Sequence, residues 1–342
     1  MFNKKLYNTP YHSVNLSKYK YLVTGGAGFI GSNLVEYLLR FGAGHVRVLD
    51  NLSNGYFENI QEFLNLPNFE FIEGDIRDLD TCKQAVEGMD FISHQAALGS
   101  VPRSITDPIT SNQVNISGFL NMLVAAKDSL TLIQMVYAAS SSTYGDSPSL
   151  PKVEGNEGNP LSPYAVTKLV NELYADVFSR VYGCHTIGLR YFNIFGPKQN
   201  PNNPYAAVIP IFCKHFIEGT LPKIHGDGIT SRDFTFVENA VQANVKAMEG
   251  GLEDQQTPQL SAHQVFNVAC GDQISLNEMV EILREISGKD LCATYGPERA
   301  GDVKHSKASI AKLKDFCGYV PKIRFKEGLE ITYGYIEENL PI

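Results

Sequence analysis

The stretch Thr24-Gly25-Gly26-Ala27-Gly28-Phe29-Ile30-Gly31 decides the fold, and its glycines recur at three-residue steps from position 25. An apolar run, 19–23, precedes it, and a segment with helical spacing of apolar residues, 29–41, begins inside it. In such a strand–turn–helix unit, the first glycine permits a tight turn, the second lets the backbone approach a pyrophosphate, and the third lets helix pack on strand. The helix N-terminus then faces the phosphates. The stretch therefore predicts a dinucleotide-binding site.

Asp50 ends the next apolar run, 46–49, and stands about 20 residues after the last glycine of the turn. An acidic side chain at this place accepts hydrogen bonds from ribose hydroxyls and repels a 2′-phosphate. We therefore expect NAD, and not NADP, as the cofactor. Asp75 follows the third run, 69–72, and two interpretations of it are open: contact with adenine, or the cap of the next helix.

Apolar runs and helical segments alternate along the first half of the chain. The predicted strands cover 19–23, 46–49, 69–72, 91–93, 131–138 and 185–189, and the longest helices cover 111–128 and 163–182. Strands that are apolar on both faces and separated by helices indicate a parallel sheet with helices on both sides. We predict an α/β fold, a Rossmann-type doubly wound parallel sheet, whose ligands bind at the carboxyl ends of the strands.

The pattern loosens after Gly196. Helices are predicted at 210–218, 238–249, 275–287 and 309–316, short apolar pieces at 221–224, 265–268 and 291–294, and a polar surface loop at 250–263. These elements predict a smaller α+β lobe that binds the substrate. The predicted division is an N-terminal extension at 1–19, an NAD-binding domain at 20–193 with helices added from later segments, and a lobe at 194–342.

Composition narrows the classes of partner. The 342 residues carry a net charge of −8, whereas a protein that binds a nucleic-acid backbone needs a basic face, so no nucleic-acid partner is expected. There is no run of about 18 apolar residues and no apolar leader, so we expect no membrane association and a cytoplasmic location. The six cysteines form no CxxC pair and no histidine stands at zinc-finger spacing, so we expect reduced thiols and no metal site.

Tyr164 and Lys168 stand one helical turn apart, just after Ser162-Pro163. Proline suits the first turn of a helix, and residues four apart share a helix face. A nearby cation favours the phenolate and lowers its pKa, so we expect Tyr164 to act as a general base toward a hydroxyl group. Ser140 follows a predicted strand in a cluster of serines. It is placed to share the substrate's proton, and a simple cap of the next segment is its other interpretation.

Four features together resemble those of the extended short-chain dehydrogenase/reductase superfamily. They are the glycine turn, the serines at Ser140, the pair Tyr164/Lys168, and the run Arg190-Tyr191-Phe192-Asn193. The stretches 94–104, 138–145 and 226–233 are more narrowly similar to bacterial nucleotide-sugar 4-epimerases that act on UDP-N-acetylhexosamines for surface polysaccharide synthesis. The segment before Tyr19 is similar to an extension in that subgroup.

The resemblance implies a role for each matching residue. NAD would be bound by Gly25, Gly28, Phe29, Ile30, Asp50, Asn51, Ser53, Gly55, Asp75, Ile76, Gln95, Ala96, Ala97 and Lys168. Tyr164 would be the base, Lys168 would also tune the phenol, and Ser140 with Ser142 would assist proton transfer. A UDP-sugar would be bound by Ser100, Arg103, Ser142, Asn193, Ala207, Val208, Arg232, Arg299, Asp302 and Ser306. Arg232 and Arg299 would clamp the diphosphate, because each guanidinium fork matches two phosphate oxygens.

The implied reaction is epimerisation at C4 of the sugar. Tyr164 would take the proton of the C4 hydroxyl while NAD⁺ takes the hydride, and the 4-keto sugar would turn over before hydride returns to its other face. Dehydratases of the superfamily carry an Asp-Glu pair where this chain has Ser141 and Ser142, so elimination lacks its acid. Ser306 stands where galactose-restricted members carry Tyr, and Ala207 where many carry Asn. Both small residues leave room for an N-acetyl group, so UDP-GlcNAc and UDP-GalNAc are the expected substrates.

Several alternatives stay open. Ser306 is also placed to cap a helix before Ala308. The substrate could carry a C6 carboxylate, accepted near Ser100 and Arg103, or could be UDP-Glc and UDP-Gal. A non-catalytic NAD or nucleotide-sugar sensor would share the fold without turnover. The long helices 111–128 and 163–182 bear apolar residues on more than one face, and the resemblance implies that they form a homodimer interface.

Overall fold

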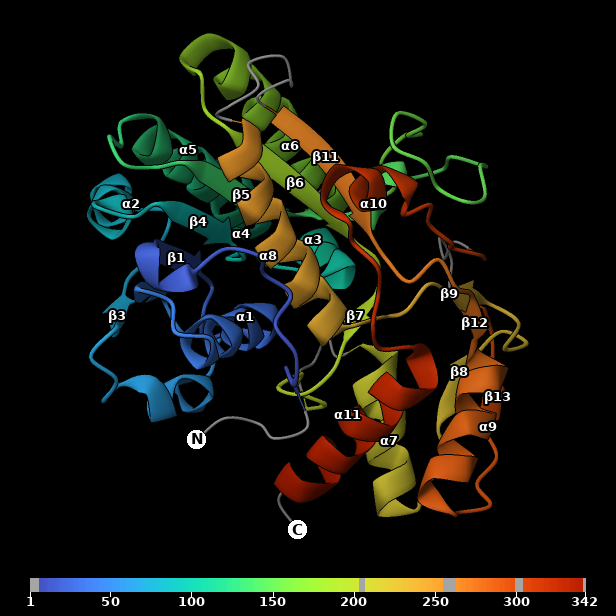
Figure 1. Cartoon of the computed structure of the whole chain (residues 1–342). Coiled ribbons are helices and arrows are strands. Elements are labelled where there is room, and N and C mark those ends of the chain that lie inside the picture. The colour runs from blue at the N-terminus through green and yellow to red at the C-terminus, as the bar shows by residue number, and fades with distance from the viewer. Residues whose placement is uncertain (1–5, 203–206, 255–262, 299–303, 341–342) are drawn as a thin grey trace.

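The chain folds around a parallel sheet of seven strands in the order β11-β6-β5-β4-β1-β2-β3 (Figure 1). The computed structural model describes residues 6–202, 207–254, 263–298 and 304–340. The sheet strands are β1 Lys20–Thr24, β2 His45–Asp50, β3 Phe69–Glu73, β4 Phe91–His94, β5 Gln134–Ser140, β6 Thr186–Tyr191 and β11 His263–Val268. The strand order reverses between β1 and β4, which is where doubly wound sheets bind ligands. The predicted Rossmann-type fold is confirmed.

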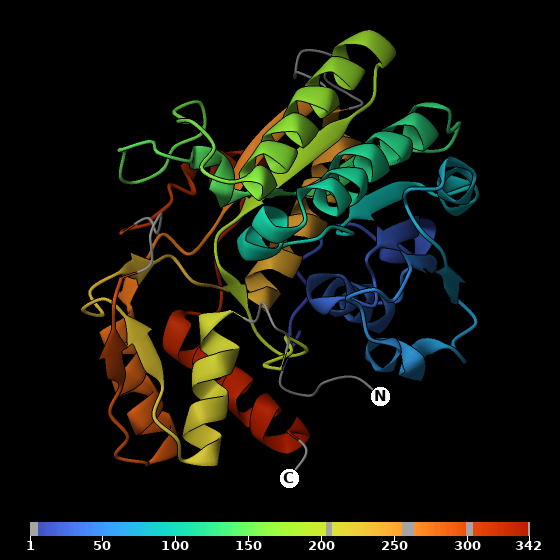
Figure 2. The same cartoon turned by 180° about the vertical axis from the view of Figure 1, so that it is seen from behind.

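Helices cover both faces of the sheet. On one face lie α1 Phe29–Arg40 and α8 Val237–Asp254, which pack against each other (Figure 1). On the other lie α2 Leu79–Val86, α5 Phe119–Lys127 and α6 Pro163–Tyr182 (Figure 2). Helix α6 has clear end signals, because the Ser162 side chain accepts from the Ala165 N–H and Gly183 ends the helix at a φ of 72°.

The predicted helix at 111–128 is longer and less regular than expected. It is preceded by α3 Val101–Thr106 and consists of α4 Pro108–Asn112, a π-helical turn Gln113–Gly118 and α5. Short 3-10 helices complete the first half, at Leu16–Lys18, Phe57–Asn59, Gln61–Phe63 and Ser141–Tyr144. The π turn places the side chain of Asn115 against the loop after β4, where it bonds both N–H and C=O of Leu98.

In the part of the chain that the structure describes, the smaller lobe has three helices and three two-stranded sheets. The helices α7 Val208–Glu218, α9 Leu276–Ser287 and α11 Phe325–Asn339 contact one another. The strand pairs are β7 Ile194–Phe195 with β10 Thr235–Phe236, β8 Lys223–His225 with β13 Thr294–Gly296, and β9 Ser231–Arg232 with β12 Ile274–Ser275. The sequence prediction assigned no element to α11.

Two segments expected in the lobe or on its surface belong to the sheet domain. The run 265–268 is part of β11, which pairs with β6 over six residues. Residues 250–254 of the expected loop continue α8, whereas 255–262 lie outside the described residues. Helix α10 Ala311–Cys317 also packs on α8 and β11. The prediction of a loop at 250–254 is therefore wrong, whereas the short apolar piece at 265–268 is a strand as its pattern suggested. Periodicity does not say which sheet a strand joins.

The N-terminal extension packs against a helix from each half of the chain, α1 and α8. Leu6, Tyr7, Tyr11 and Leu16 are buried. The Tyr7 hydroxyl donates to Asn33 Oδ1 of α1 at 2.8 Å, and the Tyr11 hydroxyl donates to Glu238 of α8. The segment thus ties α1 to α8. Within the described residues, no helix has both the length and the apolar character needed to cross a bilayer.

Candidate active site

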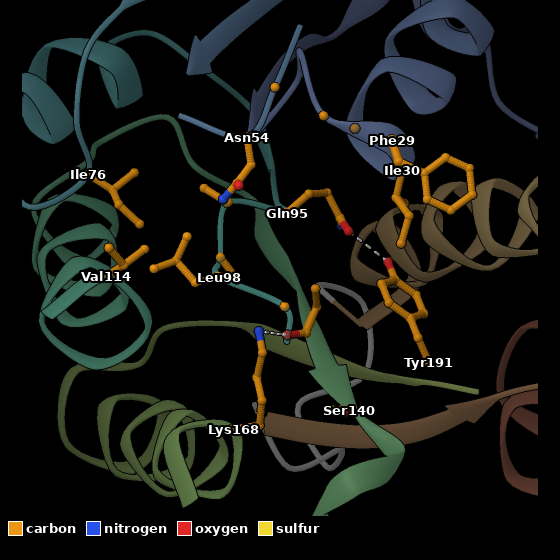
Figure 3. Close-up of a pocket in the computed structure, with 18 of the residues that line it drawn as sticks. Phe29, Ile30, Asn54, Ile76, Gln95, Leu98, Val114, Ser140, Lys168 and Tyr191 are labelled. Atoms are coloured by element: carbon orange, nitrogen blue, oxygen red, sulfur yellow. Dashed lines mark hydrogen bonds between the residues drawn. The ribbon is translucent and has the colours of Figure 1, made fainter. Parts of the chain in front are cut away.

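A cavity of about 580 Å³ opens at the carboxyl ends of β1, β2, β4, β5 and β6 (Figure 3). Its lining includes every residue that the sequence suggested for the cofactor: Gly25, Gly28, Phe29, Ile30, Asp50, Asn51, Ser53, Gly55, Asp75, Ile76, Gln95, Ala96, Ala97 and Lys168. Tyr164, Ser140, Ser142 and Asn193 line it as well. Segments far apart in the sequence therefore meet at the switch point of the sheet.

The glycine turn is dictated by close backbone approach. Gly25 has a φ of 67°, and a Cβ there would lie 2.7 Å from the Ala96 nitrogen. A Cβ at Gly31 would lie 2.2 Å from the Gly25 oxygen, so helix α1 could not sit on the turn. Gly28, the N-cap of α1, offers no side-chain acceptor, so the first N–H groups of the helix stay available to a ligand. This end of the cavity suits a phosphate group.

Asp50 is fixed by the backbone at the end of β2 and is 7% exposed. Its Oδ2 accepts from the Ala27 N–H at 3.0 Å and its Oδ1 from the Leu52 N–H at 2.9 Å. Burial raises the pKa of this carboxyl group, and the two backbone bonds oppose the rise. Arg47 of the same strand pairs with Glu70 at 2.7 Å and is not among the cavity residues.

Asp75 and Ile76 lie on the same side of the cavity as Asp50. Asp75 accepts from Asn51 Nδ2 at 2.9 Å and pairs with Arg77, whose hydrogen bond lowers the pKa of the carboxyl group to about 2. The interpretation of Asp75 as a helix cap is wrong, because Asp78 caps α2. Ile76 packs over Gly118, where a Cβ would lie 2.6 Å from Ile76 Cδ1.

The cavity lining also includes residues that the sequence analysis did not assign to the site, and four of them have side chains larger than alanine that bear on its shape. These four are Asn54, Leu98, Val114 and Tyr191. Leu98, Val114 and Ile76 form an apolar wall opposite Phe29 and Ile30 (Figure 3). Val114 reaches the cavity from the π turn, and local sequence pattern carries no signal for that geometry. Tyr191 had a signal, because it closely follows the predicted strand 185–189.

Ser140, Tyr164 and Lys168 meet at the other end of the cavity. The Ser140 oxygen accepts from both the backbone N–H (3.1 Å) and the hydroxyl (2.8 Å) of Ser142, and Ser140 also hydrogen-bonds the phenol of Tyr164. Lys168 is 4% exposed and its Nζ donates to the Ala138 carbonyl at 2.7 Å. The Tyr164 N–H donates to Ser104 Oγ at 3.0 Å, so α3 holds the start of α6.

The pKa of Tyr164 is shifted opposite to our expectation. Desolvation at the cavity wall raises the pKa of the phenol, and the bond to Ser140 opposes the rise only in part. Burial also lowers the pKa of Lys168 to about 8. The one-turn spacing of phenol and amine was predicted, but the ammonium is directed at a backbone carbonyl. Burial therefore outweighs any attraction between the two side chains.

Among the described residues suggested for the sugar nucleotide, Ser142 and Asn193 line this cavity, and the others are not lining residues: Ser100, Arg103, Ala207, Val208, Arg232 and Ser306. Arg232 and Ser306 are neighbours in the lobe, because the Ser306 N–H donates to the Ser231 carbonyl at 3.1 Å. Ser306 caps no helix, since α10 starts at Ala311 behind Ile310. Ala207 is the exposed N-cap of α7, which Val208 begins. Arg299 and Asp302 lie outside the described residues.

Ser100 and Arg103 belong to the start of α3. The Ser100 hydroxyl caps this helix by accepting from the Arg103 N–H at 3.2 Å. Arg103 Nη2 donates to Asn54 Oδ1 at 3.0 Å, on the loop after β2. Both groups therefore have protein partners, and neither is among the cavity residues.

Comparison with known proteins agrees with this geometry. The model of the NAD dependent epimerase/dehydratase family matches residues 21–269. The chain belongs to this family. The resemblance found in the sequence is thereby confirmed, and so is NAD as the cofactor of this epimerase/dehydratase.

Relatives of this epimerase/dehydratase match along nearly the whole chain. A solved UDP-N-acetylglucosamine 4-epimerase from Methanobrevibacter ruminantium M1, in complex with UDP-N-acetylmuramic acid, is 37% identical, has a TM-score of 0.87, and covers 94% of this chain and 99% of its own. A UDP-glucose 4-epimerase of Mycolicibacterium smegmatis is 35% identical, over 93% of this chain and 98% of its own. A UDP-glucuronic acid 4-epimerase from Bacillus cereus, solved with UDP-glucuronic acid and NAD, is 30% identical, has a TM-score of 0.82, and covers 93% and 99%.

The donor set of the cavity fits NAD. At one end, the uncapped start of α1 suits a pyrophosphate, and the buried Asp50 suits ribose hydroxyls without a basic partner for a 2′-phosphate. At the other end, Lys168 offers an ammonium beside Ser140 and Tyr164. The end of the cavity at Asp50 thus suits the adenosine half of NAD, and we call it the adenosine end, whereas the end at Tyr164 carries the phenol, hydroxyl and ammonium groups.

Proposed function

We propose that this NAD-dependent UDP-sugar 4-epimerase interconverts UDP-GlcNAc and UDP-GalNAc. The observation that carries the proposal is the position of Ser306, a small residue whose backbone N–H is bonded to the carbonyl of Ser231, the residue before Arg232. With Arg232 on the diphosphate, a small neighbour leaves volume for an N-acetyl group, whereas a bulky one would fill it. The similarity to the archaeal UDP-N-acetylglucosamine 4-epimerase supports the same assignment.

In the proposed mechanism Tyr164 exchanges a proton with the C4 hydroxyl of the sugar. NAD⁺ held by the residues of the cavity would supply the acceptor and then the donor of the C4 hydride. Ser142 donates two hydrogen bonds to the Ser140 oxygen, so Ser140 directs its own hydrogen to Tyr164. Such a bond favours the phenolate over the neutral phenol. Lys168, held at the Ala138 carbonyl, supplies positive charge and a donor for the nicotinamide ribose.

Elimination is not supported at this site. Among the described residues that line the cavity, the carboxyl groups are those of Asp50 and Asp75, both at the adenosine end. The 3-10 turn after Ser140 carries Ser141 and Ser142 where an acid would have to protonate a departing hydroxyl. Epimerisation needs no such acid, because the hydride returns to C4 and the proton returns from Tyr164 to the C4 oxygen, so no hydroxyl group leaves.

A uronic-acid substrate is the second candidate, and one observation weakens it. The side chain expected to accept the C6 carboxylate, Arg103, is not among the residues that line the cavity, and its Nη2 donates to Asn54 Oδ1. The test still includes this candidate, because a UDP-glucuronic acid 4-epimerase is among the relatives. UDP-Glc and UDP-Gal form the third candidate pair.

The test is product analysis after separate incubation with UDP-GlcNAc, UDP-Glc and UDP-glucuronic acid. We expect the highest kcat/KM on UDP-GlcNAc. Ser306→Tyr is expected to lower kcat/KM on UDP-GlcNAc by about 100-fold and to leave UDP-Glc within about threefold, because added volume excludes the acetyl group alone. Equal loss on both sugars would contradict the assignment of Ser306, and inactivity on all three would contradict the function.

We also propose that two copies of the chain associate through α4–α5 and α6. Leu173 and Val181 of α6 are 58% and 62% exposed, and Ile109 of α4 is 69% exposed. Apolar side chains gathered on neighbouring helices favour burial against a partner. A cytoplasmic location is proposed too, since all six cysteines are unpaired thiols.

A further inference from the structure

A closed ring of side-chain hydrogen bonds lies behind the cavity and joins the two halves of the chain. Asn244 of α8, which is fully buried, donates from Nδ2 to the Tyr191 oxygen at 2.7 Å. Tyr191 donates to Gln95 Oε1 at 3.1 Å, the bond drawn in Figure 3. Gln95 Nε2 donates to Ser93 Oγ at 2.9 Å and to Asn244 Oδ1 at 3.1 Å. Ser93 Oγ donates to Asn244 Oδ1 at 3.1 Å.

The backbone of α8 fixes the direction of every proton in this ring. Asn244 Nδ2 also donates to the Ala240 carbonyl at 2.8 Å, and a carbonyl oxygen can only accept. The nitrogen of the Asn244 amide must therefore face Ala240 and Tyr191. Because Tyr191 accepts from Asn244, its own hydrogen goes to Gln95 Oε1. Gln95 in turn directs its NH₂ group to Ser93 and Asn244.

The ring determines what the cavity wall presents to a ligand. Tyr191 ends β6, Gln95 follows β4, and the two flank the end of β5, where Ser140 stands. The hydroxyl hydrogen of Tyr191 and both amide hydrogens of Gln95 are used inside the ring. Burial raises the pKa of Tyr191 to about 12, so this phenol stays neutral beside the reactive Tyr164.

We propose that Asn244 is a positioning residue for the cofactor. By fixing the ring, it holds Gln95 and Tyr191 as a rigid wall against the nicotinamide half of NAD, between Ile30 of the glycine turn and Ser140 (Figure 3). A residue of the second half of the chain thus completes a cofactor site built mostly from the first half. The inference rests on NAD as the cofactor and not on the identity of the sugar.

Asn244→Asp tests the proposal with little change of shape. An ionised aspartate has two acceptor oxygens and no donor. The Ala240 carbonyl and the Tyr191 oxygen therefore both lose the hydrogen bond that Asn244 donates to them, and the remaining donors of the ring have to change direction. We expect the dissociation constant for NAD, measured by calorimetry on sugar-free protein, to rise about tenfold, which is roughly one lost hydrogen bond. We expect kcat to fall about tenfold or more and KM for the sugar nucleotide to stay within about twofold.

Asn239→Asp is the matched control. Asn239 lies on the same helix, is 1% exposed, and donates from Nδ2 to the Ile323 carbonyl at 2.7 Å, away from the cavity. This variant loses a comparable buried bond, so its unfolding temperature should fall while NAD affinity and kcat stay at the wild-type values. If the two variants weakened NAD binding equally, Asn244 would contribute only to the stability of the fold, and the proposal would be overturned.

Tyr191→Phe probes the ring from its other side. It removes the hydroxyl, so NAD affinity should fall, and adding Asn244→Asp in this background should change it by less than about threefold. Additive losses, or an NAD affinity of Tyr191→Phe within about twofold of wild type, would overturn the proposal even if Asn244→Asp does not fold. NAD binding is measured without sugar, so failure of the proposed substrate would leave these outcomes unaffected.

Discussion

At the scale of single residues, the phenol of Tyr164 is the group that the proposed reaction cannot lose. It is desolvated and hydrogen-bonded to Ser140, so its ionisation depends on that bond and on the charge brought to the cavity. Tyr164→Phe keeps the ring and removes only the hydroxyl. We expect turnover to fall by about 10³-fold or more, with the NAD content of the purified protein unchanged.

Tyr182→Phe is the control for that change, because Tyr182 ends the same helix and is 55% exposed. Its turnover should equal that of the wild-type protein. A Tyr164→Phe variant that keeps a tenth or more of wild-type activity would remove Tyr164 from its proposed role.

Lys168 destabilises the folded protein, because its charged side chain is buried in the cavity wall. Burial lowers its pKa from 10.5 to about 8, so the folded state binds fewer protons than the unfolded state between these two values. The free energy of unfolding therefore rises with pH between about 8 and 10.5. Below pH 8 the buried Lys168 destabilises the folded state to the full extent. Each unit of such a shift corresponds to about 1.4 kcal/mol.

Lys168→Met should consequently stabilise the NAD-free protein while it lowers turnover. After the lost bond to Ala138 is subtracted, we expect a gain of about 2 kcal/mol at pH 7, seen as a higher unfolding temperature. The difference from wild type should shrink as pH approaches 10.5. If Lys168→Met unfolded at a lower temperature than the wild-type protein at pH 7, the proposed destabilisation by the buried Lys168 would be contradicted.

At the scale of elements, the π turn between α4 and α5 shapes the adenosine end of the cavity. It brings Gly118 against Ile76, where an added Cβ would lie 2.6 Å from Cδ1. Gly118→Ala is expected to cost about 1–3 kcal/mol by overpacking, measured by denaturant unfolding. In an Ile76→Ala background the same change should cost almost nothing, because the space has been freed. Equal costs in both backgrounds would show that Ile76 is not the obstacle.

At the scale of the whole molecule, the apolar face of α6 is expected to be an interface. Leu173→Glu places a charge at its centre, and we expect light scattering to report one chain where the wild-type protein has the mass of two. Leu221→Glu is the control, since Leu221 is 50% exposed in the lobe and should leave the mass unchanged. A wild-type protein with the mass of one chain would contradict the proposed dimer.

The sequence by itself determined the features that depend on near neighbours in the chain. The glycine turn, the acid at Asp50 and the one-turn spacing of Tyr164 and Lys168 follow from backbone sterics and helix geometry. Strand and helix periodicity was enough for the parallel sheet of the first half, and so for the end of the sheet where the cavity lies.

Only the tertiary structure decided which segments meet and what their meeting does to each group. It placed β11 and α8 in the sheet domain, put Val114 and Asn244 at or behind the cavity, and turned the pKa shift of Tyr164 upward. The physical reason is common to all three. Burial, strand pairing and hydrogen-bond closure join residues that are distant in sequence, and a local pattern contains no information about the partner.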